Sequence, residues 1–541
     1  MFAELLIYAM VVFGPWAFGT TQGWSVWVVN GMGYALSLLW LGSKVARRVL
    51  GYCQPEGQQR VGGDSCGESG GPLADARVTP YPGQIAHSPG AAGPVMKLGR
   101  PTTAGLAILT FALLGYCFIS AVNSRAVYLP AEERFEYHGC ILWLPHSFDS
   151  TSSWRAFWTL LALASSFWAI RDWLLGKTSS ELKPDRRDSS RSGRPRHRFP
   201  GRLNRLLCVL CMNGAALALE GIIQREADCP KLLFLIQPQL HRTAVSQFGP
   251  FAYRANGAEY FNLLWPVCLG FWSSWEAQSR QIKSHHLLMV CAMLMAACPL
   301  ISTSRGGALV AFGLLIASGA FFLGRRLVGK PAPRGYALAA LLLVVLGAPA
   351  LGLCLGWTAL KPRLATLREG LQDRARICGL AQRMAGEHIL FGTGPGTYET
   401  VSELYRPNDT DFWPAQVHND WLETRITFGV AGASLLALAG VLAASQILLA
   451  LRTQTGRSLA PFIGFAFAGC LLHARFDFPF QVHSILTLFV VLSAVLCALS
   501  YEPPCRLGRQ PAGLRFRLDP ELPEARRGNS GHIESRCSSR R

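Results

Sequence analysis

Residues 414–451 read PAQVHNDWLETRITFGVAGASLLALAGVLAASQILLAL, and this stretch joins a polar segment to a long apolar one. The apolar part, 427–451, is longer than the ~20 residues that a helix needs to cross the hydrocarbon core of a bilayer. The sequence therefore predicts a membrane-spanning helix that is entered directly from His418, Asn419 and Asp420. An imidazole, an amide and a carboxylate are thus predicted at one membrane boundary.

The rest of the chain has the composition of a polytopic membrane protein. Of its 541 residues, 50% are hydrophobic and only 16% are charged, and the mean hydropathy is +0.24. These values favour an all-α fold with about twelve transmembrane helices. The predicted spans are 3–21, 24–42, 103–122, 156–175, 206–223, 258–275, 286–302, 306–324, 335–357, 427–451, 459–473 and 483–501.

Polar segments divide these spans into groups. The segment after the second span is rich in Gly, Pro, Ser and Gln, and the C-terminal tail is basic and interrupted by Pro and Gly. Both are predicted to be disordered and cytoplasmic. The predicted order is two spans in 1–42, a disordered loop at 43–102, spans three to nine in 103–357, a large extracytoplasmic loop at 358–426, three spans in 427–501 and a basic tail at 502–541.

The formal net charge of +19 has a simple explanation in this topology. With residue 1 in the cytoplasm, most of the 52 Lys and Arg residues fall on the cytoplasmic side. This asymmetry is what the positive-inside rule requires, so it argues against nucleic acid as the partner. The 16 cysteines show no framework, and a bridge between Cys140 and Cys229 is left open.

Two arginines stand where apolar runs meet the predicted outer boundary. Arg305 lies in the tight turn at 302–307, where it either binds a ligand or extends to water. Arg254 precedes the span at 258–275 and is either a ligand contact or an interfacial anchor. Asn256 is placed to cap the incoming helix or to contact the same ligand.

The large loop contributes two further arginines. Arg376 and Arg383 are seven residues apart and share one face of a predicted amphipathic helix. They either bind the ligand or form the basic face of a helix that lies on the membrane. Later in the loop, 391–398 is rich in glycine but lacks the Lys-Ser/Thr ending of a phosphate-binding loop, so it is predicted to be a turn.

The remaining candidates are two histidines and their neighbours. His418 lies about one turn before the apolar face of its helix, with Asn419 beside it, and can act as a base or hold a hydroxyl group. His473 and Asp477 are four residues apart in the last outside turn, where they pair either with each other or with the arginines.

Arginines gathered around a histidine on one leaflet suit an anionic lipid headgroup. Guanidinium groups bind phosphate oxygens through paired donors, and a polyprenyl diphosphate carries its phosphates at this depth. If the diphosphate leaves a sugar C1, the arginines stabilise the growing charge while His418 accepts a proton from the attacking hydroxyl. This scheme needs no nucleotide, metal or other cofactor, and the pair Asp409 and Asp411 is a weak metal signal.

Several of these motifs together resemble the O-antigen ligase/polymerase superfamily of membrane glycosyltransferases. The likeness covers about residues 205–500, and its most specific part is the His-Asn segment. The motifs that carry it are GPFAYRAN at 249–256, STSRG at 302–306, the run from Arg376 to FGTGPGTY at 391–398, VHNDWL at 417–422 and HARFDFP at 473–479.

The resemblance implies a twelve-span protein of the bacterial inner membrane with a large periplasmic loop between helices 9 and 10. It implies metal-independent transfer of a glycan from an undecaprenyl-diphosphate carrier to a hydroxyl group of a glycan, lipid or protein acceptor. It also implies catalytic roles for Arg254 and Arg305 on the diphosphate and for His418 on the acceptor side. Arg376, Asn419, Asn256, Arg383, His473 and Asp477 are the expected substrate-binding residues.

Within the superfamily, ligases attach glycans to the lipid A core of lipopolysaccharide, polymerases extend a repeat, and related enzymes glycosylate protein hydroxyls. The sequence does not separate them, although the His-Asn motif favours the ligase. A transporter or flippase of lipid-linked glycans would also need many helices and polar groups. Against it, the candidate residues gather at one membrane face. A structural scaffold would leave the arginines and histidines unexplained.

Overall fold

The computed structural model describes residues 2–49, 94–176, 199–240, 242–278, 284–328, 335–405 and 415–501. The chain divides into two units, Met1–Pro504 and Cys505–Arg541, and everything below concerns the first. The predicted tail at 502–541 and the pair Asp409 and Asp411 lie outside the described residues. So does the predicted loop at 43–102, except at its ends, which are helical up to Val49 and from Pro94.

The described residues form a helical protein with 14 α-helices. A single antiparallel hairpin within the described part pairs Tyr128 with Phe135. The elements are α1 (Phe2–Trp16), α2 (Gly23–Val49), α3 (Pro94–Val122), β1 (Ala126–Leu129), β2 (Arg134–Tyr137), α4 (Ser150–Leu175), α6 (Gly201–Glu226), α7 (Arg254–Gln278), α8 (Leu287–Ile301), α9 (Arg305–Leu327), α10 (Gly335–Ala365), α11 (Leu367–Glu387), α12 (Tyr398–Ser402), α13 (Asp420–Ala450), α14 (Gly456–His473) and α15 (His483–Leu499), with 3-10 turns η1 (Phe18–Thr20), η2 (Ala244–Ser246), η3 (Ser284–His286), η4 (Glu403–Tyr405) and η5 (Pro479–Gln481).

Each predicted span falls largely on a helix. Within the described residues, 6 helices are long and apolar enough to cross a membrane. These are the whole of α6, α9 and α13 and the greater parts of α2, α3 and α10. Helices α1, α8 and α15 are shorter apolar helices. The all-α class is therefore confirmed, while the number of twelve crossings stays a prediction.

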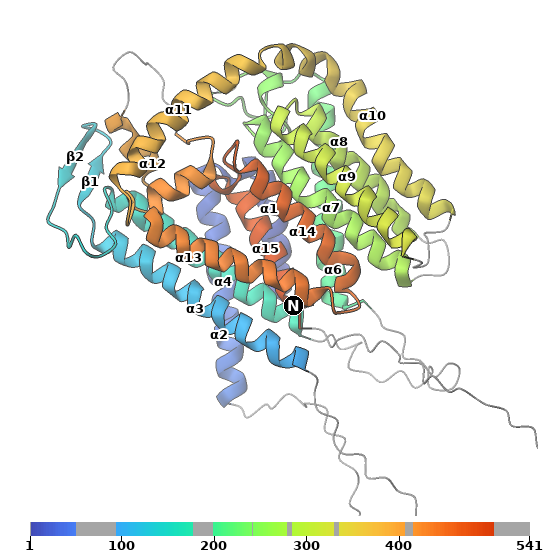
Figure 1. The fold of residues 1–541 in the computed structure, drawn as a ribbon, viewed down its shortest axis with the longest axis horizontal. Coiled ribbons are helices and arrows are strands. Elements are labelled where there is room, and N and C mark those ends of the chain that lie inside the picture. The colour runs from blue at the N-terminus through green and yellow to red at the C-terminus, as the bar shows by residue number, and fades with distance from the viewer. Residues whose placement is uncertain are drawn as a thin grey trace, which may run out of the picture. The chain divides into compact units, whose positions relative to one another are not determined.

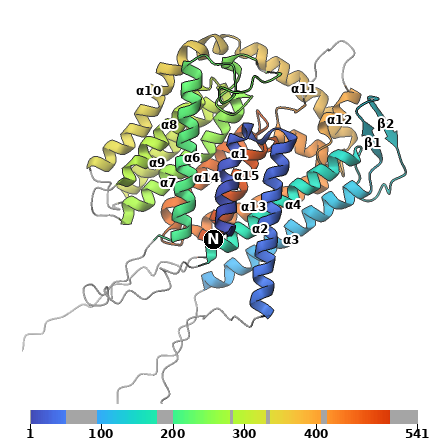
Figure 2. The same ribbon diagram turned by 180° about the vertical axis from the view of Figure 1, so that it is seen from behind.

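Helix α7 lies at the centre of the packing. It contacts α6, α8, α9, α14 and α15, and its Tyr260, Trp265 and Trp272 are at most 1% exposed. A second group of neighbours consists of α2, α3, α4 and α13, with α3 and α13 side by side in both views (Figures 1 and 2). Because α7 is buried on all sides, the polar groups at its N-terminal end are held rigidly.

The segment predicted as the large loop, 358–426, is mostly helical where it is described. Helix α10 continues into it as far as Ala365, and α11 and α12 follow. Figure 1 shows α11 running across one end of the helices, from the end of α10 to α12. Residues Ala381, Met384 and Tyr398 of this segment pack with Val417 and Ile426, so the segment has its own small core.

The beginning of α13 is kinked where another segment crosses it. Gly429 has φ 59° and ψ −168°, a conformation open essentially only to glycine. Around it, Thr393 N donates to Ile426 O at 2.8 Å and Val430 N donates to Ile389 O at 2.8 Å. The glycine-rich run at 391–398 is therefore a turn that pairs with the kinked helix, as its sequence predicts.

We predict that Gly429→Ala destabilises the protein by about 2 kcal/mol or more, because a Cβ there would collide with Leu390 O and Gly392 N in a strained conformation. The measurement is thermal unfolding in detergent. Gly440→Ala is the matched control, since a Cβ at Gly440 of the same helix meets nothing within 4 Å. Equal melting temperatures for the two variants would contradict the prediction.

Candidate active site

The N-terminus of α13 is fastened to the turn that follows α14. Asn419 caps the helix by accepting from Leu422 N at 3.3 Å. Asp420, which is 3% exposed, donates from its backbone N to Ala474 O at 2.9 Å. The Asp420 carboxylate accepts from Phe480 N at 2.8 Å and from the Gln481 side chain at 3.1 Å. The residues just before α13 are thus fixed against residues 474–481.

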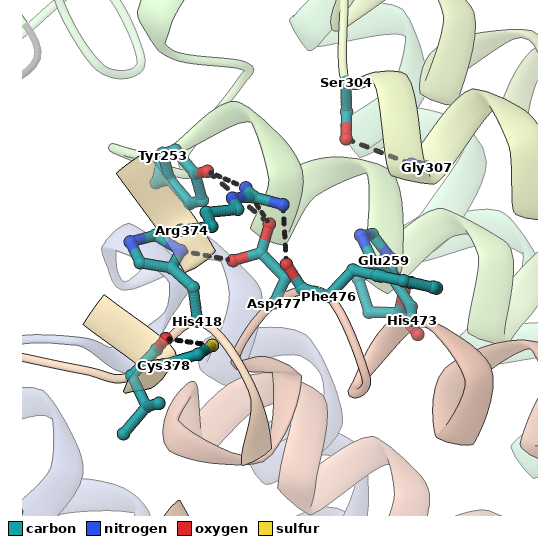
Figure 3. Close-up of polar contacts among 11 residues, drawn as sticks. Tyr253, Glu259, Ser304, Gly307, Arg374, Cys378, His418, His473, Phe476 and Asp477 are labelled. Carbon is teal, nitrogen blue, oxygen red and sulfur yellow. Dashed lines mark hydrogen bonds and ion pairs between the residues drawn. The ribbon is translucent and has the colours of Figure 1, made fainter. Parts of the chain in front are cut away.

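This fastening brings His418 to Asp477. The Nδ1 atom of His418 is 3.0 Å from Asp477 Oδ1. His418 has φ 56°, a left-handed conformation that is uncommon outside glycine and is often found at functional sites. The Asp477 side chain is 5% exposed and that of His418 is 21% exposed, with the second ring nitrogen facing away from Asp477 (Figure 3).

Arg374 of α11 binds the other oxygen of the same carboxylate. Its Nη2 atom donates to Asp477 Oδ2 and to the Tyr253 hydroxyl, both at 3.3 Å. Its Nη1 atom donates to Phe476 O at 2.6 Å. Both oxygens of Asp477 are therefore engaged, one by a guanidinium and one by an imidazole (Figure 3). This arrangement leaves the carboxylate unsuited to a metal ion.

The charges in this cluster follow from its contacts. Burial would raise the pKa of Asp477, but the hydrogen bond from His418 and the charge of Arg374 outweigh it and hold the pKa below its usual value. Burial disfavours the charged form of Arg374, but Asp477 and Tyr253 raise its pKa. An ionised Asp477 can only accept, so His418 Nδ1 must donate. In neutral His418, Nε2 then carries the lone pair.

Aromatic rings hold His418 and Tyr253 in place. Phe478 stacks on Tyr253 with ring centroids 5.5 Å apart and contacts His418 edge-on at 4.9 Å. Burial raises the pKa of the Tyr253 hydroxyl, so this group stays protonated. The cluster of Tyr253, Arg374, His418 and Asp477 is thus a charge-balanced site with one imidazole nitrogen available to a substrate.

Comparison with known proteins identifies the family of this region. The O-antigen ligase family model matches residues 290–437. The chain carries an O-antigen ligase domain. The match includes Arg305, Arg374 and His418, whereas Tyr253 and Asp477 lie outside it. No match was found among curated proteins.

An O-antigen ligase domain among helices that are long and apolar enough to cross a membrane indicates a multi-pass membrane enzyme of the glycosyltransferase or ligase type. The predicted resemblance is therefore confirmed.

Arg305 lies at the start of α9, within the O-antigen ligase domain. Ser304 caps this helix through Gly307 N at 3.1 Å. The Arg305 Nη1 atom donates to Arg363 O at 3.1 Å and to Thr366 O at 3.3 Å, at the corner between α10 and α11. Its Nη2 atom lies beside Gly370, only 2.6 Å from the position that a Cβ there would take. Arg305 thus leaves Nη2 and Nε without a hydrogen bond to the described protein.

Other predicted residues lie elsewhere. Arg254 donates to Val245 O at 3.0 Å, so it holds the segment before α7 rather than joining the cluster. Asn256 is 6% exposed, and its backbone N bonds to Tyr253 O at 3.0 Å. Arg376 and Arg383 are exposed on α11. The arginine of α11 that joins the cluster is Arg374, two residues before Arg376, and the sequence analysis did not select it.

His473 corrects another expectation. Its Nδ1 atom pairs with Glu259 of α7 rather than with Asp477, and both side chains of this pair are 1% exposed. The ring is therefore too buried to contact a substrate. Sequence reasoning missed Glu259, although a carboxylate inside the predicted span 258–275 is a signal for a functional residue. It also missed Tyr253, which has no such signal.

One further group of potential metal ligands lies at the other end of α7. Glu276, His285 and His286 have ligand atoms within 4.8 Å of one another. His285 pairs with Glu276 at 3.1 Å, while His286 Nδ1 accepts from Trp272 Nε1 at 3.1 Å. Because the Trp272 bond leaves the proton of neutral His286 on Nε2, this group does not form a prepared metal site. Cys140 and Cys229 are free thiols.

We predict that Gly370→Ala reduces transfer by the O-antigen ligase domain at least tenfold without lowering stability. The added methyl group displaces the Arg305 guanidinium, which is the flexible end of a side chain, while alanine favours the helix by about 1 kcal/mol over glycine. Transfer rate and melting temperature are measured together. Gly379→Ala on the same helix is the control, because a Cβ there meets nothing within 4 Å. Equal rates for the two would refute the role of Arg305.

We also predict a pH signature of Asp477. Because its pKa is lowered in the folded state, its contribution to stability is present above the unfolded carboxyl pKa of about 3.9 and is lost as the pH falls through the folded value. The difference in melting temperature between wild type and Asp477→Asn should therefore shrink as the pH falls below about 4.

The control for this measurement is Asp228→Asn, since Asp228 is an exposed acid away from the cluster. Its melting temperature should follow that of wild type over the whole pH range. A difference between wild type and Asp477→Asn that grew as the pH fell below about 4 would mean that the folded protein raises the pKa of Asp477.

Proposed function

We propose that this protein is a glycosyltransferase of the bacterial inner membrane, with its site at the periplasmic face. It would move a glycan from an undecaprenyl-diphosphate carrier to an acceptor hydroxyl, in the manner of an O-antigen ligase. The observation that carries the proposal is the Asp477 carboxylate, which holds an imidazole on one oxygen and a guanidinium on the other. The O-antigen ligase domain supports the same class of donor and acceptor.

His418 serves the acceptor in this proposal. Asp477 keeps the proton on Nδ1, so Nε2 is oriented as a base toward solvent or substrate. The imidazolium that forms on proton transfer is stabilised by the adjacent carboxylate. The 3.0 Å contact and the packing of Phe478 fix the ring, so little reorganisation is needed during the reaction.

The arginines serve the donor. Arg374 is already paired with Asp477, so it contributes positive charge beside the substrate without being free to bind a phosphate oxygen through the same donor. Arg305 uses only Nη1 for its contacts with the protein and keeps Nη2 and Nε for phosphate oxygens. Guanidinium groups bind phosphate through such adjacent donors. The stretch with Arg305 begins a predicted span, so a diphosphate at headgroup depth would reach it without moving into hydrocarbon.

The proposed reaction balances without a cofactor. The acceptor oxygen attacks C1 of the sugar and gives its proton to His418 Nε2. The bond between C1 and the diphosphate oxygen breaks, and its electron pair leaves with the diphosphate. Arg305 stabilises the negative charge that grows on this leaving group. The ligase-like acceptor is our choice within the superfamily, and a growing polysaccharide or a protein hydroxyl are the other outcomes of the test.

The test uses protein purified in detergent, a polyprenyl-diphosphate glycan and candidate acceptors, with no nucleotide. We expect transfer by wild type, a loss of about 10² to 10⁴ for His418→Ala and a loss of about 10² to 10³ for Arg305→Ala. Arg452→Ala, an exposed arginine just after the other end of α13, should match wild type. The acceptor that is used identifies the subclass.

Folded wild type that binds the donor but never transfers the glycan would overturn the proposal. A transporter of lipid-linked glycans would then be the better explanation. Full activity of His418→Ala would leave the enzyme in place but remove the base from the mechanism.

A further inference from the structure

The protein contains a second carboxylate–imidazole pair that the proposed reaction does not use. Glu259 of α7 and His473 of α14 are joined through Glu259 Oε2 and His473 Nδ1. Both side chains are 1% exposed, whereas the side chain of His418 is 21% exposed. Burying such a pair costs free energy of desolvation unless its hydrogen bonds compensate for the loss of water. We therefore asked which structural role could explain its place between α7 and α14.

The pair lies between the two halves of the site. On one side, His473 O accepts from Phe476 N at 2.8 Å and from Asp477 N at 3.0 Å. The backbone of His473 therefore begins the turn that presents Asp477. On the other side, the ring nitrogen Nε2 lies 3.2 Å from the position that a Cβ on Gly306 would take. His473 thus packs directly against the residue after Arg305 (Figure 3 shows His473 beside Glu259).

The first turn of α9 is held by α7 as well. The side chain of Asn262 donates to Gly307 O at 2.9 Å, and Asn262 is fully buried. Glu259 and Asn262 are three residues apart on α7, so they share one face of that helix. One face of α7 therefore carries both the partner of His473 and the contact to the Arg305 turn.

The proton arrangement suits this contact. An ionised Glu259 makes His473 Nδ1 the donor, and in the neutral imidazole Nε2 then carries the lone pair. That lone pair faces the N-terminal turn of α9, the positive end of the helix dipole. The imidazole is thus held between a carboxylate on α7 and the start of the helix that bears Arg305.

We propose that Glu259 and His473 are positioning residues that set the distance between Arg305 and the His418–Asp477 pair. This inference rests on the proposed function, in which Arg305 holds the leaving diphosphate and His418 the attacking hydroxyl. Neither residue touches substrate. Their role is to align donor and acceptor, because a misplacement of about 1 Å between reacting groups can cost about 10² in rate.

The decisive variant is Gly306→Ala. Its methyl group would press on His473 Nε2, and the ring cannot easily retreat because Nδ1 is bound to Glu259. We expect the α9 turn to shift, so that kcat falls about tenfold or more or the donor KM rises by a similar factor. The acceptor KM and the melting temperature should change little. Gly313→Ala on the same helix is the matched control, since a Cβ there meets nothing within 4 Å.

A second variant tests whether the effect passes through His473. In His473→Asn, the side-chain amide can still donate to Glu259, but no ring atom remains at the position of Nε2. The double variant Gly306→Ala/His473→Asn should therefore be more active than Gly306→Ala/His473→Gln, in which an amide reaches toward Gly306. If His473 only stabilised the fold, the two double variants would differ in melting temperature but not in the predicted order of kcat.

The outcomes separate this inference from the proposed function. Absence of transfer by wild type would refute the proposed function. Transfer by wild type with equal kinetics for Gly306→Ala and Gly313→Ala would refute only the positioning role. If the His473 variants do not fold, the comparison of the two glycine variants decides by itself.

Discussion

The site depends on one buried carboxylate that makes no contact with a substrate in our scheme. Asp420 joins the first residue of α13 to the turn after α14 through its backbone and through both oxygens of its side chain. A carboxylate with its oxygens bonded to N–H donors holds two chain segments in one geometry, since leaving it unpaired at 3% exposure would be costly. His418 lies two residues before this link and Asp477 lies inside the linked turn, so their meeting follows from it.

Asp477 then combines two functions in one group. Because Arg374 and His418 bind different oxygens, the guanidinium helps keep the carboxylate ionised without taking the place of the imidazole. Ionisation fixes Nδ1 as the donor, and that choice gives Nε2 its lone pair. In the proposed reaction, the charge of Arg374 on α11 thus helps to determine which nitrogen of His418 faces the acceptor, while Arg305 remains available to phosphate.

The sequence predicted the helices well because apolar runs of membrane length leave few other folds. It also marked His418 and Asp477 as candidate residues, since polar groups at a membrane boundary are conspicuous, but it did not indicate that they contact each other. It did not distinguish Arg374 from Arg376, because the face of α11 that meets Asp477 depends on the rotation of a helix that has arginines on several sides. The pairing of His473 with Glu259 joins residues of α7 and α14, and no local pattern specifies such a contact. Tyr253 likewise acquires its role only from the packing of Phe478 and Arg374.

The protein thus has two carboxylate–imidazole pairs, and we assign them different roles because their solvent exposure differs. Asp477 and His418 present an imidazole that is 21% exposed, which allows a hydroxyl to reach its free nitrogen. Glu259 and His473 are 1% exposed, and the corresponding nitrogen faces a glycine of α9 instead of a substrate. Burial turns a group that can transfer protons into one that can only hold a position. The backbone of His473 leads into the turn of Asp477, so residues 473–477 contribute one member to each pair. In our proposal, Arg305 is aligned against this segment.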